Sequence, residues 1–184
     1  MGVKEIGNNE DFDNKEFKCL IEECGWDIGQ AWCMYFAELV WRKAYKKHDK
    51  SYDYELEMLF SAGVMATYSN FRRAGDWSID ESPEVGAIMI MQKYKKGEPT
   101  WQGHAGIVID VRDKDVKTVE GNTNPQGSRD GQEVAQKLRP RDFNIKKNGL
   151  VMKGFIHPLQ VVTNNPIDAL GCYAHDDIAE NHLI

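Results

Sequence analysis

The spacing of apolar residues changes near Gly75, and this change limits the possible folds more than any other feature of the chain. Before Gly75, apolar residues recur at intervals of three, four and seven, which is the pattern of one buried helix face. After Gly75, short apolar runs are separated by turn residues, which is the pattern of β-strands. The 184 residues contain no repeat and no Gly/Ser-rich linker. The sequence therefore predicts an α+β domain in which N-terminal helices pack on a C-terminal antiparallel sheet.

Three helices are predicted in the first part of the chain. A short amphipathic helix covers residues 14–24, and a longer one covers residues 31–47 and has Cys33 in its first turn. A third helical pattern covers residues 54–73. One more helix is expected at the C-terminus, because the Asn-Pro pair at 165–166 is a helix-start signal.

The second part of the chain predicts strands. The run AIMIM at 87–91 is continuously apolar, which suits a strand that is buried on both faces. The lysine-rich segment 93–97 is expected to be a solvated turn. The other strands are expected at 104–111 and 116–120, which form a hairpin, and at 133–138 and 153–157.

Charge and hydropathy exclude two classes of partner. Lys and Arg total 23 against 29 Asp and Glu, which gives a net charge of −6 and argues against binding nucleic acid. No apolar run approaches the roughly 20 residues that cross a bilayer, so membrane insertion is not expected. The first 17 residues are polar and acidic and lack the apolar stretch of a Sec signal, which predicts synthesis in the cytoplasm.

The cysteines are expected to be reduced thiols rather than disulfides or metal ligands. Cys19, Cys24, Cys33 and Cys172 are too few and too unevenly spaced for a disulfide scaffold. No Cys-x-x-Cys pair is present, so no zinc site is predicted.

One group of residues suits nucleophilic catalysis. The first turn of a helix stabilises a thiolate, which favours Cys33 as a nucleophile, and His104, expected to open a strand, is a candidate base. Glu120 and Asn122 lie two residues apart at the end of the neighbouring strand, so an extended backbone would put both on one face. Singly, these residues also fit a small core cysteine, a structural histidine and a turn. Their order along the chain, which is that of a papain-like thiol site, favours catalysis.

Five segments resemble, in order, the landmarks of CHAP domains, which are cysteine, histidine-dependent amidohydrolases or peptidases related to NlpC/P60. The segments are GQAWCMYFAELVW (29–41), PEVGAIMIM (83–91), GHAGIVID (103–110), VEGNTNP (119–125) and GFIHP (154–158). The resemblance implies a papain-like CHAP fold for a catalytic domain over residues 1–158. Residues 159–184 would be a C-terminal extension, expected to be a helix packed on the same domain.

The resemblance also implies a role for each residue of the group. Cys33 looks like the nucleophile, His104 the general base, Glu120 the group that orients His104, and Asn122 a further polar support. Some relatives bind calcium ahead of the nucleophile, but here that stretch offers only Glu22, Glu23 and Asp27. We therefore expect no metal and no cofactor.

Residues around this group are candidates for oxyanion or substrate binding. The Cys33 backbone N–H is a natural oxyanion donor, and Gln30 either adds a side-chain amide or caps the helix. Trp32, Trp101 and Gln102 flank the expected cleft and either hold sugar or peptide by stacking and hydrogen bonding or simply pack. The remaining histidines lack a comparable partner in the sequence and are expected to be structural or surface residues: His48, His157, His175 and His182.

The function that the resemblance implies is hydrolysis of a peptide or amide bond in bacterial peptidoglycan, as an endopeptidase or an N-acetylmuramoyl-L-alanine amidase. Its partners would be stem peptides or cross-bridges. A phage endolysin or an antibacterial effector fits, each reaching the wall by release or another export route, with a holin system or an immunity protein as context. A monomer is expected. The alternatives are a non-catalytic wall-binding module, or a thiol hydrolase that acts on a protein isopeptide or a small amide.

Overall fold

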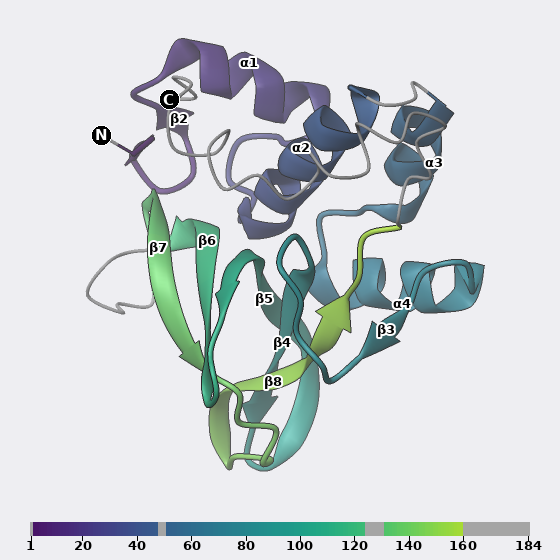
Figure 1. Ribbon diagram of the computed structural model, residues 1–184. Coiled ribbons are helices and arrows are strands. Elements are labelled where there is room, and N and C mark those ends of the chain that lie inside the picture. The colour runs from purple at the N-terminus through teal and green to yellow at the C-terminus, as the bar shows by residue number, and fades with distance from the viewer. Residues whose placement is uncertain (1, 48–50, 124–130, 160–184) are drawn as a thin grey trace.

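The α+β class predicted from the sequence is confirmed. The computed structural model describes residues 2–47, 51–123 and 131–159, and Figure 1 shows helices gathered over one end of a twisted sheet. Two antiparallel strands come first, β1 (Glu5–Ile6) and β2 (Asp11–Phe12), so the N-terminal part is not purely helical. The helices are α1 (Lys15–Glu23), α2 (Cys33–Lys46), α3 (Ser51–Leu59) and α4 (Val64–Ala74).

One antiparallel sheet holds the other strands, in the order β3-β8-β4-β5-β6-β7. The strands are β3 (Ile79–Asp80), β4 (Ile88–Lys95), β5 (Glu98–Val111), β6 (Asp115–Thr123), β7 (Glu133–Pro140) and β8 (Asn148–Ile156). Helix α2 contacts β5 and β6, and α4 contacts β4 and β5. Helix α2 therefore packs on the sheet at β5 and β6. The expected C-terminal helix falls outside the described residues.

The first two helices form where the sequence predicts them, but the third is two helices. In α1, the Asn14 side chain caps the first turn by accepting from the Phe17 N–H at 2.9 Å. The predicted helix over 54–73 is interrupted because the chain turns between α3 and α4. There the Thr67 hydroxyl accepts from the Ser61 N–H at 3.0 Å and Gly63 is the N-cap of α4.

The β1-β2 hairpin packs against the start of α2 through aromatic side chains. Phe12 is fully buried, and its ring centroid lies 5.0 to 5.1 Å from those of Phe17, Trp26 and Trp32. The Trp32 indole N–H donates to the buried Glu5 carboxylate at 2.9 Å. Because Trp32 directly precedes Cys33, this packing fixes the point at which α2 begins.

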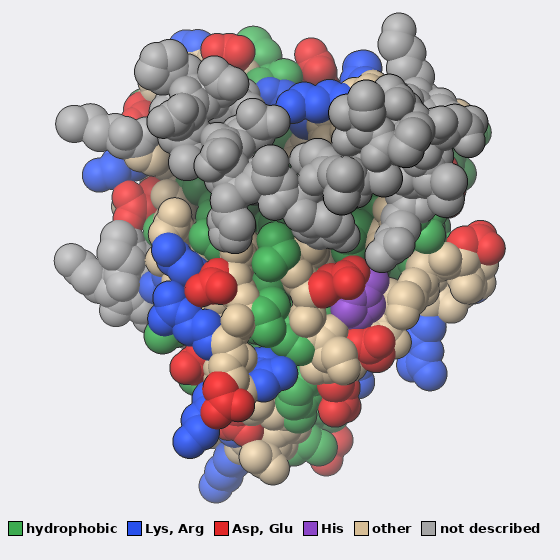
Figure 2. Space-filling view, viewed as in Figure 1, with side chains coloured by type: hydrophobic (Ala, Val, Ile, Leu, Met, Phe, Trp, Pro, Cys, Tyr) green, Lys and Arg blue, Asp and Glu red, His purple; other side chains and the backbone are tan. Residues whose placement is uncertain are grey.

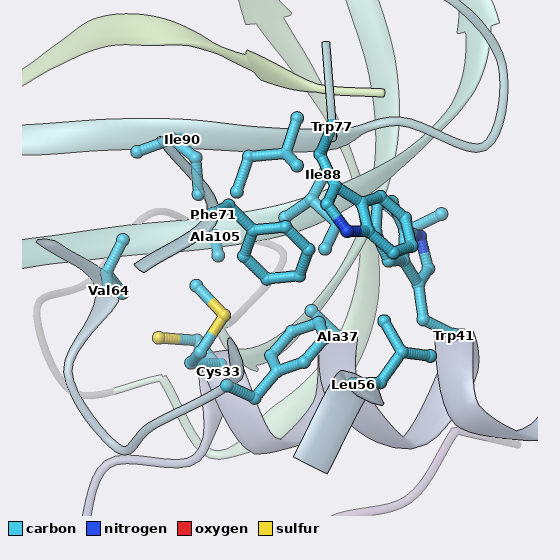
Figure 3. Packing of buried hydrophobic residues seen from close by; sticks show 14 of the residues in the cluster. Cys33, Ala37, Trp41, Leu56, Val64, Phe71, Trp77, Ile88, Ile90 and Ala105 are labelled. Carbon is cyan, nitrogen blue, oxygen red and sulfur yellow. The ribbon is translucent and has the colours of Figure 1, made fainter. Parts of the chain in front are cut away.

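Strand β4 is buried on both faces, as predicted for AIMIM. Ile88 and Ile90 pack with the helices, whereas Met89 and Met91 pack in a second cluster with side chains of β5, β6 and β8. Figure 3 shows the helix-side cluster, with Cys33 at one end near Val64 and the Trp41 and Trp77 rings at the other. The strand runs on to Lys95 and β5 begins at Glu98, so the turn predicted at 93–97 is only two residues long.

Charged side chains are mixed over the face of the molecule shown in Figure 2. Acidic and basic groups alternate there around a strip of apolar side chains. The net charge of −6 is thus not gathered into one acidic field on this face. Within residues 2–47, 51–123 and 131–159, no helix has the length and apolar character needed to cross a bilayer.

Candidate active site

Cys33 is the first residue of α2, as the sequence predicts. Its side chain is 6% exposed, at the edge of the helix-side core. The N-cap residue, Trp32, makes no side-chain capping bond of its own. Instead, the Asn122 side-chain oxygen accepts from the Trp32 backbone N–H at 3.1 Å, which supplies from β6 a partner for a free N–H group at the helix start.

His104 lies in the middle of β5, not at its start. The prediction missed residues 98–103, whose pairing with β4 extends the strand. Gly103 precedes the histidine at a point of close contact, since a Cβ there would lie 2.5 Å from the Met91 carbonyl oxygen. The His104 side chain is 12% exposed, and its Nε2 lies 2.8 Å from Glu120 Oε2.

Glu120, on β6, reaches His104 on the adjacent strand β5 because the nearby β5 residue Gly106 has no side chain. A Cβ on Gly106 would lie 2.5 Å from Glu120 Cγ, so only glycine leaves room for the carboxylate to lie across β5. On the other side, a Cβ on Gly121 would lie 2.6 Å from Phe36 Cβ and from the Trp32 ring. The two glycines therefore allow Glu120 to contact β5 and α2 to pack closely on β6.

His104 lies between Cys33 and Glu120: its Nε2 is 2.8 Å from Glu120 Oε2, and Cys33 is near enough to the ring to affect its pKa. Burial by itself would lower the pKa of His104, but hydrogen bonds with Cys33 and Glu120 outweigh burial and raise that pKa to about 9. Because Nε2 is hydrogen bonded to Glu120, Nδ1 is the ring nitrogen that can interact with the Cys33 thiol. The arrangement suits an imidazolium that hydrogen bonds to sulfur on one side and to a carboxylate on the other.

Two partners of Glu120 were not found from the sequence. Arg139 on β7 donates to both carboxylate oxygens, from Nε to Oε1 at 2.7 Å and from Nη2 to Oε2 at 2.5 Å, and the Thr118 hydroxyl donates to Oε1 at 2.6 Å. Burial would raise the pKa of Glu120, but the bonds from Arg139 and His104 hold it well below its usual value. The strand predicted at 133–138 stops one residue short of Arg139, and only the pairing of β7 with β6 brings this side chain to Glu120.

Asn122 does not share a face with Glu120. Its φ is +53°, and the pairing with β7 shifts register between Glu120 and Thr123, so the extended backbone that the prediction assumed is broken there. Asparagine tolerates this left-handed conformation better than most residues. The side-chain amide donates to the Gly131 carbonyl at 2.6 Å, while its oxygen holds the Trp32 N–H. Asn122 therefore contacts the helix start rather than the imidazole.

The expected substrate-binding residues have different environments. Trp32 is fully buried among aromatic rings, so of the two alternatives for this residue the structure favours packing over contact with a ligand. Trp101 is 78% exposed on β5, and Gln102 beside it accepts from the Lys93 ammonium at 2.9 Å. The Gln30 side-chain oxygen accepts from the Tyr35 hydroxyl at 2.5 Å and does not cap α2.

His157 is a buried structural residue, which is one of the two roles expected of it, but it has partners that the sequence did not reveal. It was expected to lack a comparable partner, but its Nε2 lies 2.9 Å from Asp80 and its Nδ1 lies 3.0 Å from Glu84. It thereby ties the end of β8 to β3 and the following loop. The other three histidines outside the site, at 48, 175 and 182, fall outside the described residues. In the part of the chain that is described, no three His, Cys, Asp or Glu side chains are grouped to hold a metal ion.

An antiparallel sheet that presents a histidine and a carboxylate to a cysteine at a helix start has the components of a thiol hydrolase. The CHAP domain profile matches residues 25–122, more than half of the chain. The chain therefore belongs to the CHAP domain family, as its resemblance predicted. No curated protein and no solved structure matches it. The matched range contains Cys33, His104, Glu120 and Asn122 but ends before Arg139.

Proposed function

We propose that the protein is a cysteine hydrolase that cleaves a peptide or amide bond of bacterial peptidoglycan. Membership of the CHAP domain family supports a hydrolase of the amidase or peptidase type that acts on the cell wall. The observation that carries the assignment to particular residues is the position of His104, whose Nε2 lies 2.8 Å from Glu120 and whose ring is beside Cys33 at the start of α2. A wall-binding module without turnover would not require this arrangement of cysteine, histidine and glutamate.

The geometry suggests a two-stage reaction. The Cys33 thiolate attacks the substrate carbonyl carbon, and a backbone N–H group at the start of α2 is placed to receive the developing oxyanion. The His104 imidazolium then gives its Nδ1 proton to the leaving nitrogen as the C–N bond breaks, which yields a thioester and a free amine. Neutral His104 next takes a proton from water, which attacks the thioester and releases a carboxylic acid and the thiol.

The supporting residues have separate roles in this mechanism. Glu120 accepts a hydrogen bond from the Nε2–H group of His104 and keeps the ring oriented, with Nδ1 toward sulfur. Asn122 holds the Trp32 N–H and so fixes the position of the Cys33 backbone. Trp101, exposed on the same strand as His104, is the candidate for contact with the substrate. We assign catalysis to a domain over residues 1–158, because β1 and β2 pack on the helix that carries the cysteine.

The finer assignment concerns the bond and the setting. We propose stem peptides or cross-bridges as substrates, cleaved by an endopeptidase or an N-acetylmuramoyl-L-alanine amidase, in a phage endolysin or an antibacterial effector. An endolysin would act with a holin, and an effector would be matched by an immunity protein. These settings differ in delivery, whereas the chemistry at Cys33 is the same in all of them.

The test is digestion of purified peptidoglycan of several chemotypes by the full chain, with mass analysis of the fragments. The new amine identifies the broken bond, whether at the lactyl amide, in the stem or in the cross-bridge. Cys33→Ala should lower turnover by about 10,000-fold or more and leave the fold intact. Cys19→Ala, at an exposed thiol on α1, is the matched control and should keep full activity. Absence of fragments with the wild type, or turnover by Cys33→Ala, would contradict the proposal.

A further inference from the structure

Arg139 lies on β7, at the far side of the line of residues that the proposed reaction uses. Strand β7 is the edge strand beside β6, as Figure 1 shows, and Val116 on β6 pairs with Arg139. The guanidinium reaches along β6, from the level of Val116 to Glu120, and the Arg139 side chain is 22% exposed whereas that of Glu120 is fully buried. Arg139 does not contact Cys33 or His104 in any interaction that the structure records, so any effect on the reaction must act through Glu120.

The carboxylate of Glu120 has a donor for each of its lone pairs. Oε1 accepts from Arg139 Nε and from the Thr118 hydroxyl, and Oε2 accepts from Arg139 Nη2 and faces His104 Nε2. Because the two Arg139 bonds are the parallel pair of a fork, they fix the plane of the carboxylate. With the other three donors in place, Oε2 can only accept from the imidazole, so His104 Nε2 must carry its proton.

We propose that Arg139 is a positioning residue, which sets the plane and charge of the Glu120 carboxylate and thereby tunes how tightly His104 holds its proton. This inference rests on the proposed function, because it assigns the residue a part in the same reaction. Arg139 falls beyond residue 122, where the match to the CHAP domain ends. It contributes without touching the substrate or the reacting atoms.

The direction of the effect follows from the charges around the imidazole. Among the described residues, the titratable or charged groups of this line are Cys33 from α2, Glu120 from β6 and Arg139 from β7. A buried anion stabilises the imidazolium, and the cation behind that anion partly cancels it. Removing Arg139 should therefore raise the pKa of His104 further, whereas removing the charge of Glu120 should lower it. The two changes have opposite signs.

The experiment measures the ring titration of His104 by NMR together with kcat on peptidoglycan. In Arg139→Gln, the His104 midpoint should move up by about 1 pH unit, because Thr118 and His104 still hold Glu120 in place. Turnover should fall about 10-fold, since a more tightly held proton makes a weaker general acid and a carboxylate with fewer donors orients the ring less well. Arg139→Lys keeps the charge, so its midpoint should match the wild type and its kcat should be partly restored.

Two further variants serve as controls for this experiment. Arg112→Gln removes an exposed arginine paired with Asp110 and should change neither quantity. The double variant Glu120→Gln/Arg139→Gln removes both charges of the pair, so it folds without an unpaired ion, and it should be no slower than Glu120→Gln alone. Additive losses in the double variant would show that Arg139 does not act through Glu120.

The outcomes separate this inference from the proposed function. A His104 midpoint that stays the same or falls in Arg139→Gln overturns the positioning role, even if the wild type digests peptidoglycan. If the wild type digests nothing while the midpoints still move in opposite directions, the function is wrong and the coupling stands. Arg139 would have only a structural role if kcat fell in proportion to the folded fraction. In that case the His104 midpoint would not shift and Arg139→Lys would not restore kcat.

Discussion

Two buried glutamates, each paired with an arginine, are held in opposite ways. Glu120 lies fully buried on β6, and its pKa is well below the usual value for glutamate. Glu38 is 3% exposed on α2, and burial, only partly offset by its bond to Arg42, raises its pKa to about 7. Burial beside an arginine therefore does not by itself decide the charge of a carboxylate.

The number of donors explains the difference. Glu120 faces four donor groups and takes both arms of the Arg139 fork. Glu38 accepts one bond, from Arg42 Nη1 at 3.1 Å, because the same guanidinium gives its Nε to Asp53 at 2.6 Å and lies near Glu57. The Glu120 cluster is thus organised around one carboxylate, whereas the Arg42 cluster is organised around the cation and joins α2 to α3.

The largest expected effect is on catalysis and separates the two carboxylates. Glu120→Gln should lower kcat by about 10³-fold, because His104 loses an anionic partner. The upper limb of the pH profile, expected near the His104 pKa of about 9, should move to lower pH. Glu38→Gln is the matched control and should leave kcat and both limbs unchanged. Thermal melts must accompany the assay, because Glu120→Gln leaves Arg139 without its anion.

Equal losses of kcat in Glu120→Gln and Glu38→Gln would show that the two carboxylates do not differ in their importance for catalysis. If Glu120→Gln kept a normal kcat and a normal upper limb of the pH profile, another residue would have to orient His104. Asn122 would be the next candidate, although it contacts the Trp32 N–H rather than the ring. Asn122→Ala should lower the rate without moving either limb, because a neutral amide adds no charge near His104.

The next effect is on stability and belongs to the helical cluster. Arg42→Ala should lower the free energy of unfolding by about 3 kcal/mol, because it leaves Glu38 buried without its cation and separates α2 from Asp53. The exposed pair of Arg112 with Asp110 gives the control, and Arg112→Ala should cost at most about 0.5 kcal/mol. Urea denaturation of both variants measures the contrast, and similar losses would show that the Arg42 cluster is not special.

The smallest effect is a pH dependence of stability at Glu38. Its pKa in the folded protein, about 7, is above the ordinary 4.5, so the folded state holds the proton more tightly than the unfolded state. The free energy of unfolding should therefore fall as pH rises from about 4.5 to 7. Glu38→Gln removes this term, so its stability relative to the wild type should rise by about 2.5 kcal/mol between pH 5 and pH 8. A constant difference across that range would place the raised pKa in doubt.

Local patterns predicted much of the fold. One apolar stripe located α1, and the longer stripe placed Cys33 at the start of α2. The break at Gly63 was missed because the side-chain bonds that turn the chain there join residues on both sides of it. The early start of β5 was missed because residues 98–103 gain their strand conformation from pairing with β4 rather than from their own alternation.

The residues of the site also fall into those that the sequence predicted and those that it could not. The order of Cys33, His104 and Glu120 along the chain was enough to bring these residues together in the prediction. The position of Asn122 depends on a left-handed residue in a register shift, and that of Arg139 on which strand pairs with β6. Neither follows from residue types or spacing, because both are properties of the assembled sheet.

The central claim is that His104 activates the Cys33 thiol. The most direct test lets the thiols of the protein compete for iodoacetamide near neutral pH and identifies the modified cysteines by peptide mapping. Exposure alone favours Cys19, which is exposed, over Cys33, which is 6% exposed. Burial, and then the nearby Glu38 carboxylate, raise the pKa of Cys24 to about 12 and keep that thiol protonated. We predict that Cys33 is modified first and that His104→Ala removes this advantage. Faster modification of Cys19, or an unchanged Cys33 rate in His104→Ala, would contradict the account.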